Sequence, residues 1–410
     1  MGMTPMIENT EPQTLAAIAA LIAEAPADSD LRQRAAEGGF NPGGPQAAML
    51  DEAALARIPR LHKRDLAQRQ QAPGGLAAML PFGGMAAARR VYRSPGGTLD
   101  FEGDGPDFWG FGGYVRRAGI GAGDIAVVAL SFHGTPGAFM FDEGLRAAGA
   151  TVFPAGTMGS DDLLALMEGL RATCFVGIPS HLMALLRKAE EARRTLLSGI
   201  LRHALLAGEK LTPEVRAYLA ERGITAWQAY GTADLGLVAA ECHHHAALHL
   251  REGVHVEICD PETGAPLALG QIGEVVVSLT RRVYPMLRLA TGDLSAFALQ
   301  DSCPCGHQGH SLVGILGRTD SLTKVRGMFI HPSDVTALAQ SLGLEGRLRV
   351  VVTGTAGEDR ITLLVAPGTE CAPSTLETQF RKFCALRGSA VLGRVQDFAP
   401  GLALIEDRRG

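Results

Sequence analysis

Short apolar runs alternate with amphipathic stretches through the middle of the chain. Four runs have the length and composition of buried strands, at residues 125–130, 151–156, 174–178 and 203–208. Stretches typical of amphipathic helices separate them, at residues 139–149, 161–172 and 179–194. Strands that alternate with helices in this way predict a parallel sheet with helices on its faces. We therefore expect an α/β fold for this part of the chain.

The pattern changes on both sides of this region. The first 90 residues are rich in Ala, Gly and Pro and indicate helices with breaks. Residues 254–279 predict two strands around a turn at Asp260–Gly264, which indicates a smaller β-rich unit. Beyond Gly317 the pattern predicts a small α+β module. Its expected elements are strands at residues 347–354, 360–366 and near 394–398, and a helix at 373–386 that opens with a Ser374-x-x-Glu377 capping box.

Composition and charge argue against several classes of protein. The chain has 410 residues and a net charge of −5, so it lacks the excess of basic residues that is typical of nucleic-acid-binding proteins. No apolar run approaches the roughly 18 residues that a membrane helix needs, and the first residues do not resemble a signal peptide. Seven cysteines are too few for a disulfide scaffold, which favours the reducing cytoplasm.

Cysteine and histidine gather in two stretches. Residues 240–250 hold Cys242 and four histidines, of which His243–His245 are consecutive. Cys303 and Cys305 follow in "DSCPCGHQGH", where Pro304 and Gly306 favour a turn. Three thiolates and one imidazole would close a tetrahedral structural zinc site. Consecutive histidines on an extended chain cannot all point at one ion, so the residues alone leave the histidine open. The alternative is that these are surface histidines and free thiols.

Several stretches, in order along the chain, resemble motifs of one family. "AYGTADLG" (229–236) is similar to the Tyr-Gly-x-[Ser/Thr]-Glu motif of the adenylate-forming superfamily, and "TGDL" (291–294) to its ribose-binding motif. "GRTDSLTKVRGMFIHPSDV" (317–335) is similar to its hinge motif as found in phenylacetate–coenzyme A ligase-like proteins, and "IPRLHKRDL" and "CPCGH" also resemble that subgroup. The resemblance implies an N-terminal AMP-binding domain at residues 1–316, with wound parallel sheets and a zinc-bearing β subdomain. It also implies a small mobile α+β lid at residues 317–410.

The resemblance also selects among the histidines. Members of the subgroup bind a structural zinc through a Cys, a His seven residues later and the two Cys of a Cys-x-Cys-Gly motif. In this sequence these positions are Cys242, His249, Cys303 and Cys305.

The reaction implied by the resemblance is activation of a carboxylic acid by ATP with magnesium. Pyrophosphate leaves, an acyl-adenylate forms, and the thiol of coenzyme A then takes the acyl group. Two alternatives stay open: transfer to a carrier-protein thiol or other acceptor, and a catalytically impaired relative that binds a nucleotide or acyl ligand. The family often forms homodimers.

Site residues follow from the same resemblance. Ser94, Gly96 and Gly97 lie where the phosphate loop is expected, although by themselves they indicate only a turn. The expected nucleotide contacts are Gly208, Glu209, Tyr230, Gly231, Thr232, Asp293 and Arg318. Asp234 would hold magnesium, and Arg318 and Lys324 would serve catalysis with it. Phe132, His133 and Phe141 would line a pocket for an aryl or related acid.

The sequence departs from the family at three points. Asp234 replaces a glutamate and Ala233 replaces a hydroxyl residue. The family's C-terminal Gly-Lys segment is absent from the tail "FAPGLALIEDRRG", and no lysine follows Lys382. Loss of such a cation could cost several kcal/mol of transition-state stabilisation.

Overall fold

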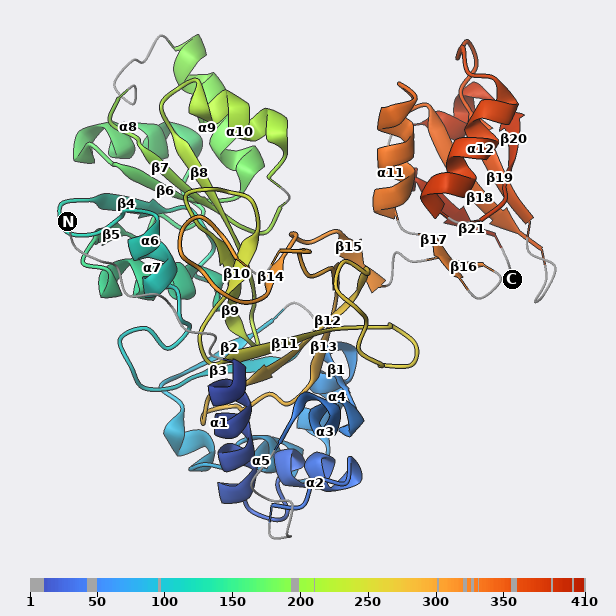
Figure 1. Cartoon of the computed structure of the whole chain (residues 1–410). Coiled ribbons are helices and arrows are strands. Elements are labelled where there is room, and N and C mark those ends of the chain that lie inside the picture. The colour runs from blue at the N-terminus through green and yellow to red at the C-terminus, as the bar shows by residue number, and fades with distance from the viewer. Residues whose placement is uncertain are drawn as a thin grey trace. The chain divides into compact units, whose positions relative to one another are not determined.

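The fold is seen in a computed structural model of the whole chain (Figure 1). The structure describes residues 11–42, 50–94, 97–192, 199–209, 211–300, 302–319, 323–325, 328–330, 332–354, 360–384, 386–399 and 402–408. The chain divides into two compact units: residues 1–291 with 295–315, and residues 292–294 with 316–410. The predicted domain boundary after residue 316 lies beside this division and stays a prediction.

The first unit is built around an eight-stranded sheet in the order β14-β10-β9-β8-β7-β6-β4-β5. Its strands are β4 (Ile125–Val128), β5 (Thr151–Phe153), β6 (Cys174–Gly177), β7 (His203–Leu206), β8 (Thr225–Thr232), β9 (Gly236–Glu241), β10 (Leu248–Leu250) and β14 (Ser311–Leu312). Strands β5, β4, β6, β7 and β8 run parallel to one another. The pairs β8–β9, β9–β10 and β10–β14 are antiparallel. The predicted parallel sheet is therefore confirmed.

Helices cover both faces of the parallel strands. They are α6 (Gly112–Arg117), α7 (Gly137–Ala147), α8 (Ser160–Leu170), α9 (Pro179–Glu191) and α10 (Pro213–Ala220). Alternate residues of each strand point to opposite faces. Val128 and Val176 pack with residues of α6 and α7, whereas Val127 and Phe175 pack with residues of α8, α9 and α10.

The helices change face between two adjacent strands. The chain leaves β4 into α7 on one face and leaves β6 into α9 on the other. Loops that diverge in this way open a crevice at the carboxyl end of the strands, where open α/β sheets bind ligands. The loops after β4, β6, β7 and β8 therefore define the edge on which a site is expected.

A second sheet has the strand order β1-β13-β12-β11, and β15 pairs with β13. Its strands are β1 (Leu61–His62), β11 (Val254–Cys259), β12 (Gly273–Leu279), β13 (Leu289–Ser295) and β15 (Gly317–Arg318). The predicted turn at Asp260–Gly264 joins β11 and β12, and the Asp260 carboxylate accepts backbone hydrogen bonds from Glu262 and Thr263. A separate hairpin pairs β2 (Arg90–Arg93) with β3 (Leu99–Glu102).

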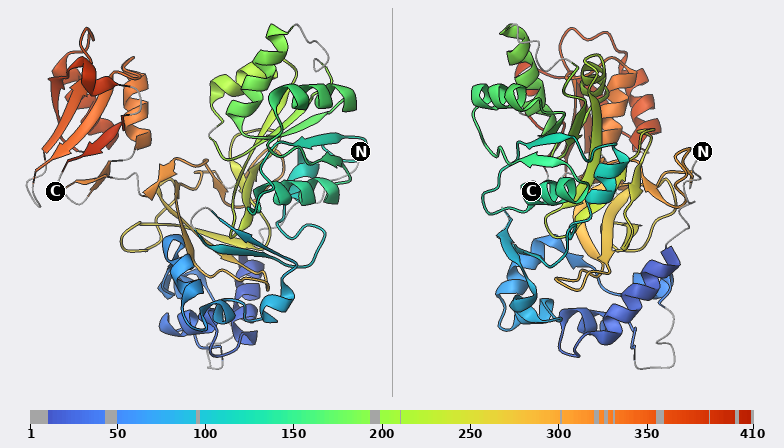
Figure 2. Two further views of the ribbon diagram at one scale, coloured as in Figure 1. Left: turned by 180° about the vertical axis from the view of Figure 1, so that it is seen from behind. Right: turned by 90° about the vertical axis from the view of Figure 1, so that its left-hand side faces the viewer.

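Short helices precede these sheets, as the breaks in the N-terminal pattern predict (Figure 2). They are α1 (Glu11–Glu24), α2 (Asp30–Glu37), α3 (Glu52–Arg57), η1 (Lys63–Asp65), α4 (Leu66–Gln71), α5 (Gly75–Met79) and η2 (Gly84–Ala87). A buried arginine joins them to the second sheet. Arg288 pairs with Glu257 at 2.8 Å and donates to the carbonyl oxygens of Ala56 and Ile58 at 2.6 Å.

The second unit contains a four-stranded sheet in the order β20-β19-β18-β21. Its elements are β16 (Thr323–Val325), β17 (Met328–Ile330), α11 (Pro332–Ser341), β18 (Leu348–Thr353), β19 (Arg360–Val365), α12 (Pro373–Cys384), β20 (Ser389–Leu392), η4 (Val395–Phe398) and β21 (Ile405–Asp407). None of the helices in the described ranges has both the length and the hydropathy for a membrane span.

Two local predictions in the second unit are wrong. The strand predicted near residues 394–398 is the short helix η4, and the strand lies earlier, at Ser389–Leu392. Glu377 does not close a capping box with Ser374. Its carboxylate instead accepts the backbone N–H of Ala390 at 2.8 Å, because β20 is an edge strand and that donor needs a partner.

Candidate functional site

The turn after β7 brings Gly208 and Glu209 to the carboxyl edge of the sheet. Gly208 has a φ of 81°, a backbone conformation that favours glycine. The Glu209 carboxylate accepts from the backbone N–H of Ser180 at 3.0 Å and from its hydroxyl at 2.7 Å. Ser180 lies in the first turn of α9, so Glu209 satisfies a donor at that helix end and joins two neighbouring loops.

Strand β8 carries Tyr230, Gly231 and Thr232 to the same edge. The Tyr230 side chain is 6% exposed. Its hydroxyl hydrogen-bonds to the Thr291 hydroxyl at 3.2 Å. A Cβ at Gly231 would approach the carbonyl oxygen of Gly236 to 2.5 Å, so glycine is required there. The turn between β8 and β9 therefore leaves no room for a side chain at position 231.

Asp234 lies in this turn with no exposed surface. Its carboxylate is 2.7 Å from the ammonium of Lys63 and 3.3 Å from the hydroxyl of Thr232. Its backbone carbonyl accepts from the guanidinium of Arg281. The carboxylate thus already has a cationic partner, and its expected role as a magnesium ligand stays a prediction.

A second carboxyl group, Asp100 on β3, is also fully buried beside Asp234. Burial and the neighbouring Asp234 carboxylate raise the pKa of Asp100 to about 8. Burial and the nearby Arg251 lower the pKa of Arg281 to about 9, and its guanidinium lies over the Phe108 ring, 4.8 Å from the centroid. We call Lys63, Asp100, Asp234 and Arg281 the carboxylate cluster.

Asp293 and Arg318 form an ion pair within the second unit. Arg318 Nη1 lies 2.8 Å from Asp293 Oδ1, and the two residues are directly paired between β13 and β15. Gly292 has a φ of 79°, and a Cβ there would come within 2.9 Å of the Arg318 guanidinium. The structure thus joins two residues that the sequence assigned to nucleotide binding from motifs far apart along the chain.

The other predicted nucleotide residues are partly described. Ser94 and Gly97 form a tight turn between β2 and β3, with the Gly97 N–H donating to the Ser94 carbonyl at 2.9 Å. Gly96 lies outside the described residues. Lys324 lies on β16, and the position of its side chain is likewise outside the description.

Two of the three predicted substrate residues line one cavity. Phe132 and His133 border a cavity of about 690 Å³ at the ends of β4 and β5. Phe141 does not contribute to it. The Phe141 side chain is 3% exposed and packs in the core against Phe111, with ring centroids 4.7 Å apart. Its place on the inner face of α7 explains this burial, because Phe139 and Asp142 of the same helix line the cavity instead.

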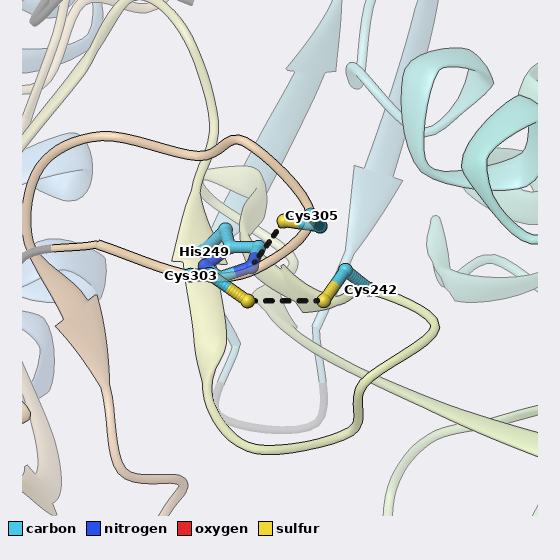
Figure 3. A group of neighbouring side chains, drawn as sticks. All are labelled: Cys242, His249, Cys303 and Cys305. Carbon is cyan, nitrogen blue, oxygen red and sulfur yellow. Dashed lines mark hydrogen bonds between the residues drawn. The ribbon is translucent and has the colours of Figure 1, made fainter.

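Four predicted metal ligands converge on one point (Figure 3). The ligand atoms of Cys242, His249, Cys303 and Cys305 all lie within 4.8 Å of one another. The Cys242 and Cys303 sulfurs are 3.7 Å apart, and the Cys305 sulfur is 3.3 Å from His249 Nε2. Zinc–sulfur bonds of about 2.3 Å at tetrahedral angles separate two sulfurs by about 3.8 Å. These four residues, the metal cluster, therefore fit a zinc ion.

Neighbouring groups orient the imidazole of His249. Its Nδ1 hydrogen-bonds to the Ser311 hydroxyl at 2.9 Å, which leaves Nε2 directed at Cys305. Burial and His307 lower the pKa of His249 to about 4, so the ring is neutral, the form that binds metal. His307 stacks on it with ring centroids 4.1 Å apart.

The three consecutive histidines take no part in the metal cluster. His245 has a φ of 51°, and its ring contacts Glu241 at 3.0 Å and Arg216 at 3.1 Å. His243 and His244 are adjacent rings, with centroids 4.2 Å apart.

Several known proteins are similar to this chain in sequence or in structure. A family model described as AMP-binding enzyme matches residues 111–281. The phenylacetate–coenzyme A ligase of Thermus thermophilus is 32% identical over 307 residues, which are 69% of this chain and 65% of that protein. That of Pseudomonas putida is 27% identical over 322 residues, 74% of this chain and 69% of that protein. An open conformation of 2-hydroxyisobutyryl-CoA ligase, in complex with 2-HIB-AMP and CoA, has a TM-score of 0.79 at 23% identity, over 97% of this chain and 91% of that one.

Residues 111–281 of this chain thus match the AMP-binding enzymes, and the chain is similar to phenylacetate–coenzyme A ligases over about 70% of its length. The chain spans only 65% and 69% of the length of the two ligases named above. The structural likeness confirms the expected α/β fold class with a smaller α+β C-terminal region.

Sequence reasoning missed four residues at the site. Lys63 lies inside the stretch "IPRLHKRDL", which pointed to the subgroup but assigned no role to its lysine. Asp100 and Arg281 lie in ordinary strand and loop contexts. Arg90 lines the cavity from β2, far along the chain from Phe132. In each case only a contact between segments distant in sequence identifies the residue, and a single sequence does not show such contacts.

Proposed function

We propose that this protein joins a carboxylic acid to coenzyme A at the expense of ATP. The acid's carboxylate attacks the α-phosphate, pyrophosphate leaves, and the thiol of coenzyme A then displaces AMP from the acyl-adenylate. Similarity to the two phenylacetate–coenzyme A ligases supports this activity. The complexes of 2-hydroxyisobutyryl-CoA ligase with an acyl-adenylate and CoA are consistent with the same two steps.

One observation carries the proposal beyond similarity. Tyr230 of the Tyr-Gly motif hydrogen-bonds to Thr291, two residues before the ribose-motif carboxylate Asp293, which is itself paired with Arg318 of the hinge motif. The Tyr-Gly motif thus contacts the strand of the ribose motif through Thr291, and, within the second unit, the ribose-motif carboxylate contacts the hinge-motif arginine. Asp293 would accept hydrogen bonds from the ribose hydroxyls.

The first step needs stabilisation of charge more than covalent participation. Among the described side chains, Arg318 supplies a cation beside Asp293 and Lys63 supplies one beside Asp234. Gly208 and Glu209 would border the adenine, and the turn at Ser94 and Gly97 would approach the phosphates. Magnesium would accompany ATP. Because Asp234 is buried against Lys63, we assign no step to magnesium at that residue.

We also propose that the metal cluster holds one zinc ion in a structural role. Three cysteines and one histidine leave no open position for substrate. The ion would link three segments: the turn after β9, the strand β10 and the loop at residues 302–310. Location in the cytoplasm and assembly as a homodimer remain predictions from sequence.

The test is ATP–pyrophosphate exchange over a panel of carboxylic acids, followed by detection of the acyl-coenzyme A product. We expect exchange with at least one aryl acid, and an Asp293→Ala variant should lower it by about 1,000-fold because the ribose loses its acceptor. Exchange without thioester formation would favour a carrier-protein acceptor. ATP binding without exchange for any acid would contradict the proposal and favour a nucleotide-binding relative, an alternative that Ala233 and Asp234 support because they replace the motif's hydroxyl residue and glutamate.

A further inference from the structure

The cavity beside Phe132 has an arginine in a wall that is otherwise largely apolar and aromatic. It is lined by the loops after β4 and β5, by the first turns of α7 and by Arg90 of β2. Phe132 and Phe139 meet edge to face there, with ring centroids 5.0 Å apart. Met158, Pro154 and Ala155 add apolar surface. Two aromatic rings and a thioether form a wall suited to another flat ring.

Arg90 is held in place by a buried carboxylate. Its Nη1 lies 2.8 Å from Glu102 Oε1, and the Glu102 side chain is 7% exposed. The other oxygen of Glu102 accepts from the Tyr92 hydroxyl and, at 3.4 Å, from Trp109 Nε1. The guanidinium also lies 5.2 Å from the centroid of the Phe139 ring. Arg90 is therefore preorganised, so a ligand bound there loses little free energy in ordering it.

The charge around the cavity selects the kind of group that Arg90 would recognise. Glu102, behind the wall, neutralises Arg90, and the acidic residue in the wall, Asp142, is paired with Arg146 at 2.9 Å. The surroundings therefore carry no net positive charge to repay the desolvation of an anion. The Arg90 side chain is nevertheless 48% exposed, and a guanidinium has five N–H donors, of which Glu102 takes only part. An uncharged oxygen matches this arrangement better than a second carboxylate.

The position of the cavity suits the far end of an acyl group. In the sheet order, only β6 separates β4, whose loop lines the cavity, from β7, whose loop holds Gly208 and Glu209. Strands lie about 4.8 Å apart, so the two loops start about 10 Å from each other. An aryl acid whose carboxyl group lies toward β7 and β8 is long enough to place a ring substituent near β4.

From these observations we propose that the acid is an aryl carboxylic acid with an uncharged oxygen substituent on its ring, such as a hydroxyl group, that accepts a hydrogen bond from Arg90. Arg90 is then a specificity-determining residue. This inference rests on the proposed function and names the substrate class for it.

The test compares phenylacetate, 4-hydroxyphenylacetate and the dianion 1,4-phenylenediacetate by kcat/KM in ATP–pyrophosphate exchange. We expect the wild type to prefer 4-hydroxyphenylacetate. Arg90→Ala should lower its kcat/KM by about 10- to 100-fold while changing that of phenylacetate by less than about threefold, because a donor built for an oxygen acts only on acids that carry one. Arg90→Lys keeps one donor and should restore part of the preference.

Arg89→Ala is the matched control, because Arg89 precedes Arg90 on the chain, is exposed and pairs with Asp104 outside the cavity. It should leave the order of the three acids unchanged. An equal loss for all three acids in both Arg90 variants would overturn the inference, as would a rise in the KM of ATP, which would assign Arg90 to a phosphate. Preference of the wild type for phenylacetate or the dianion would also overturn it. Exchange with no acid at all would overturn the proposed function, and the inference with it.

Discussion

Two partly buried polar clusters in the first unit compensate their anionic groups in different ways. The metal cluster brings three thiols and one imidazole within 4.8 Å of one another, and its ligands come from segments around residues 242–249 and 303–305. The carboxylate cluster brings two carboxyl groups together but includes the ammonium of Lys63 and the guanidinium of Arg281. Only the carboxylate cluster contains its own cations.

The two clusters differ in the source of the positive charge or proton that compensates their anionic groups. Anionic groups removed from water require a nearby cation or a proton. In the carboxylate cluster, Lys63 lies on one carboxylate and the raised pKa of Asp100 keeps a proton on the other. Burial raises the pKa of the Cys242 thiol to about 12, and a cation bound at the sulfur acts in the opposite direction. If the metal cluster holds the proposed zinc ion, its positive charge comes from outside the protein, whereas that of the carboxylate cluster comes from Lys63 and Arg281.

Removing one thiolate should have the largest effect. In Cys305→Ser we expect zinc to fall from about one ion per chain to about a tenth of that, because a hydroxyl is a poor zinc ligand. Loss of the ion should lower the free energy of unfolding by about 3–5 kcal/mol. Metal analysis after dialysis and denaturant unfolding measure both quantities.

The control is Cys371→Ser, which changes a cysteine of the second unit that lies outside the metal cluster. It should retain the zinc and the stability of the wild type. A wild-type protein that is free of zinc yet equally stable would contradict the comparison, since the metal cluster would then be buried without a cation.

Removing the internal cation should have the next largest effect. Lys63→Met keeps the length of the side chain but leaves the buried Asp234 carboxylate without its ammonium. Because Lys63 is 32% exposed, we expect a loss of only about 2 kcal/mol in the free energy of unfolding. The turn that holds Thr232 and Asp234 should shift, and pyrophosphate exchange should fall by about 100-fold.

Zinc content should stay at the wild-type value in Lys63→Met, because the two clusters share no residue. Lys188→Met provides the surface comparison: Lys188 pairs with Asp161 at 2.8 Å, with side-chain exposures of 43% and 80%. A replacement there should change stability by less than about 0.5 kcal/mol. If the two lysine variants behaved alike, Lys63 would not be the cation on which Asp234 depends.

The fold and the metal cluster could be predicted in much the same way. The apolar runs at residues 125–130 and 174–178 predicted parallel strands, and the structure confirms them because buried strands leave a pattern that is local in sequence. The metal ligands come from short motifs whose chemistry is specific. The family resemblance chose His249 over His243–His245, and it is the histidine that the structure places beside Cys305.

The carboxylate cluster could not be predicted, because its members come from four separate segments with no shared motif. Asp100 lies in an ordinary strand, and only the tertiary fold brings it to Asp234. Phe141 was assigned to the substrate pocket and lies in the core instead, because its side of α7 faces the sheet. Which face a helix presents depends on its neighbours, and the sequence around Phe141 is apolar on more than one side.

The third effect should appear as a pH dependence. Burial and Asp234 raise the pKa of Asp100 from 3.8 to about 8, so the folded protein keeps this proton over a range in which the unfolded chain has lost it. The unfolded state binds fewer protons there, and the contribution of Asp100 to the free energy of unfolding falls as pH rises from about 4 to about 8. Asp100→Asn replaces the protonated carboxyl by a neutral amide of the same shape.

The stability of Asp100→Asn relative to the wild type should therefore increase between about pH 4 and pH 8 and change little above pH 8. Denaturant unfolding at several pH values measures this difference. Asp104→Asn removes an exposed carboxylate paired with Arg89 and should show no such rise. A difference that is constant with pH would mean that Asp100 is ionised in the folded protein. The carboxylate cluster would then need Arg281 as well as Lys63 to balance two negative charges, and the loss in Lys63→Met should exceed the loss in Cys305→Ser.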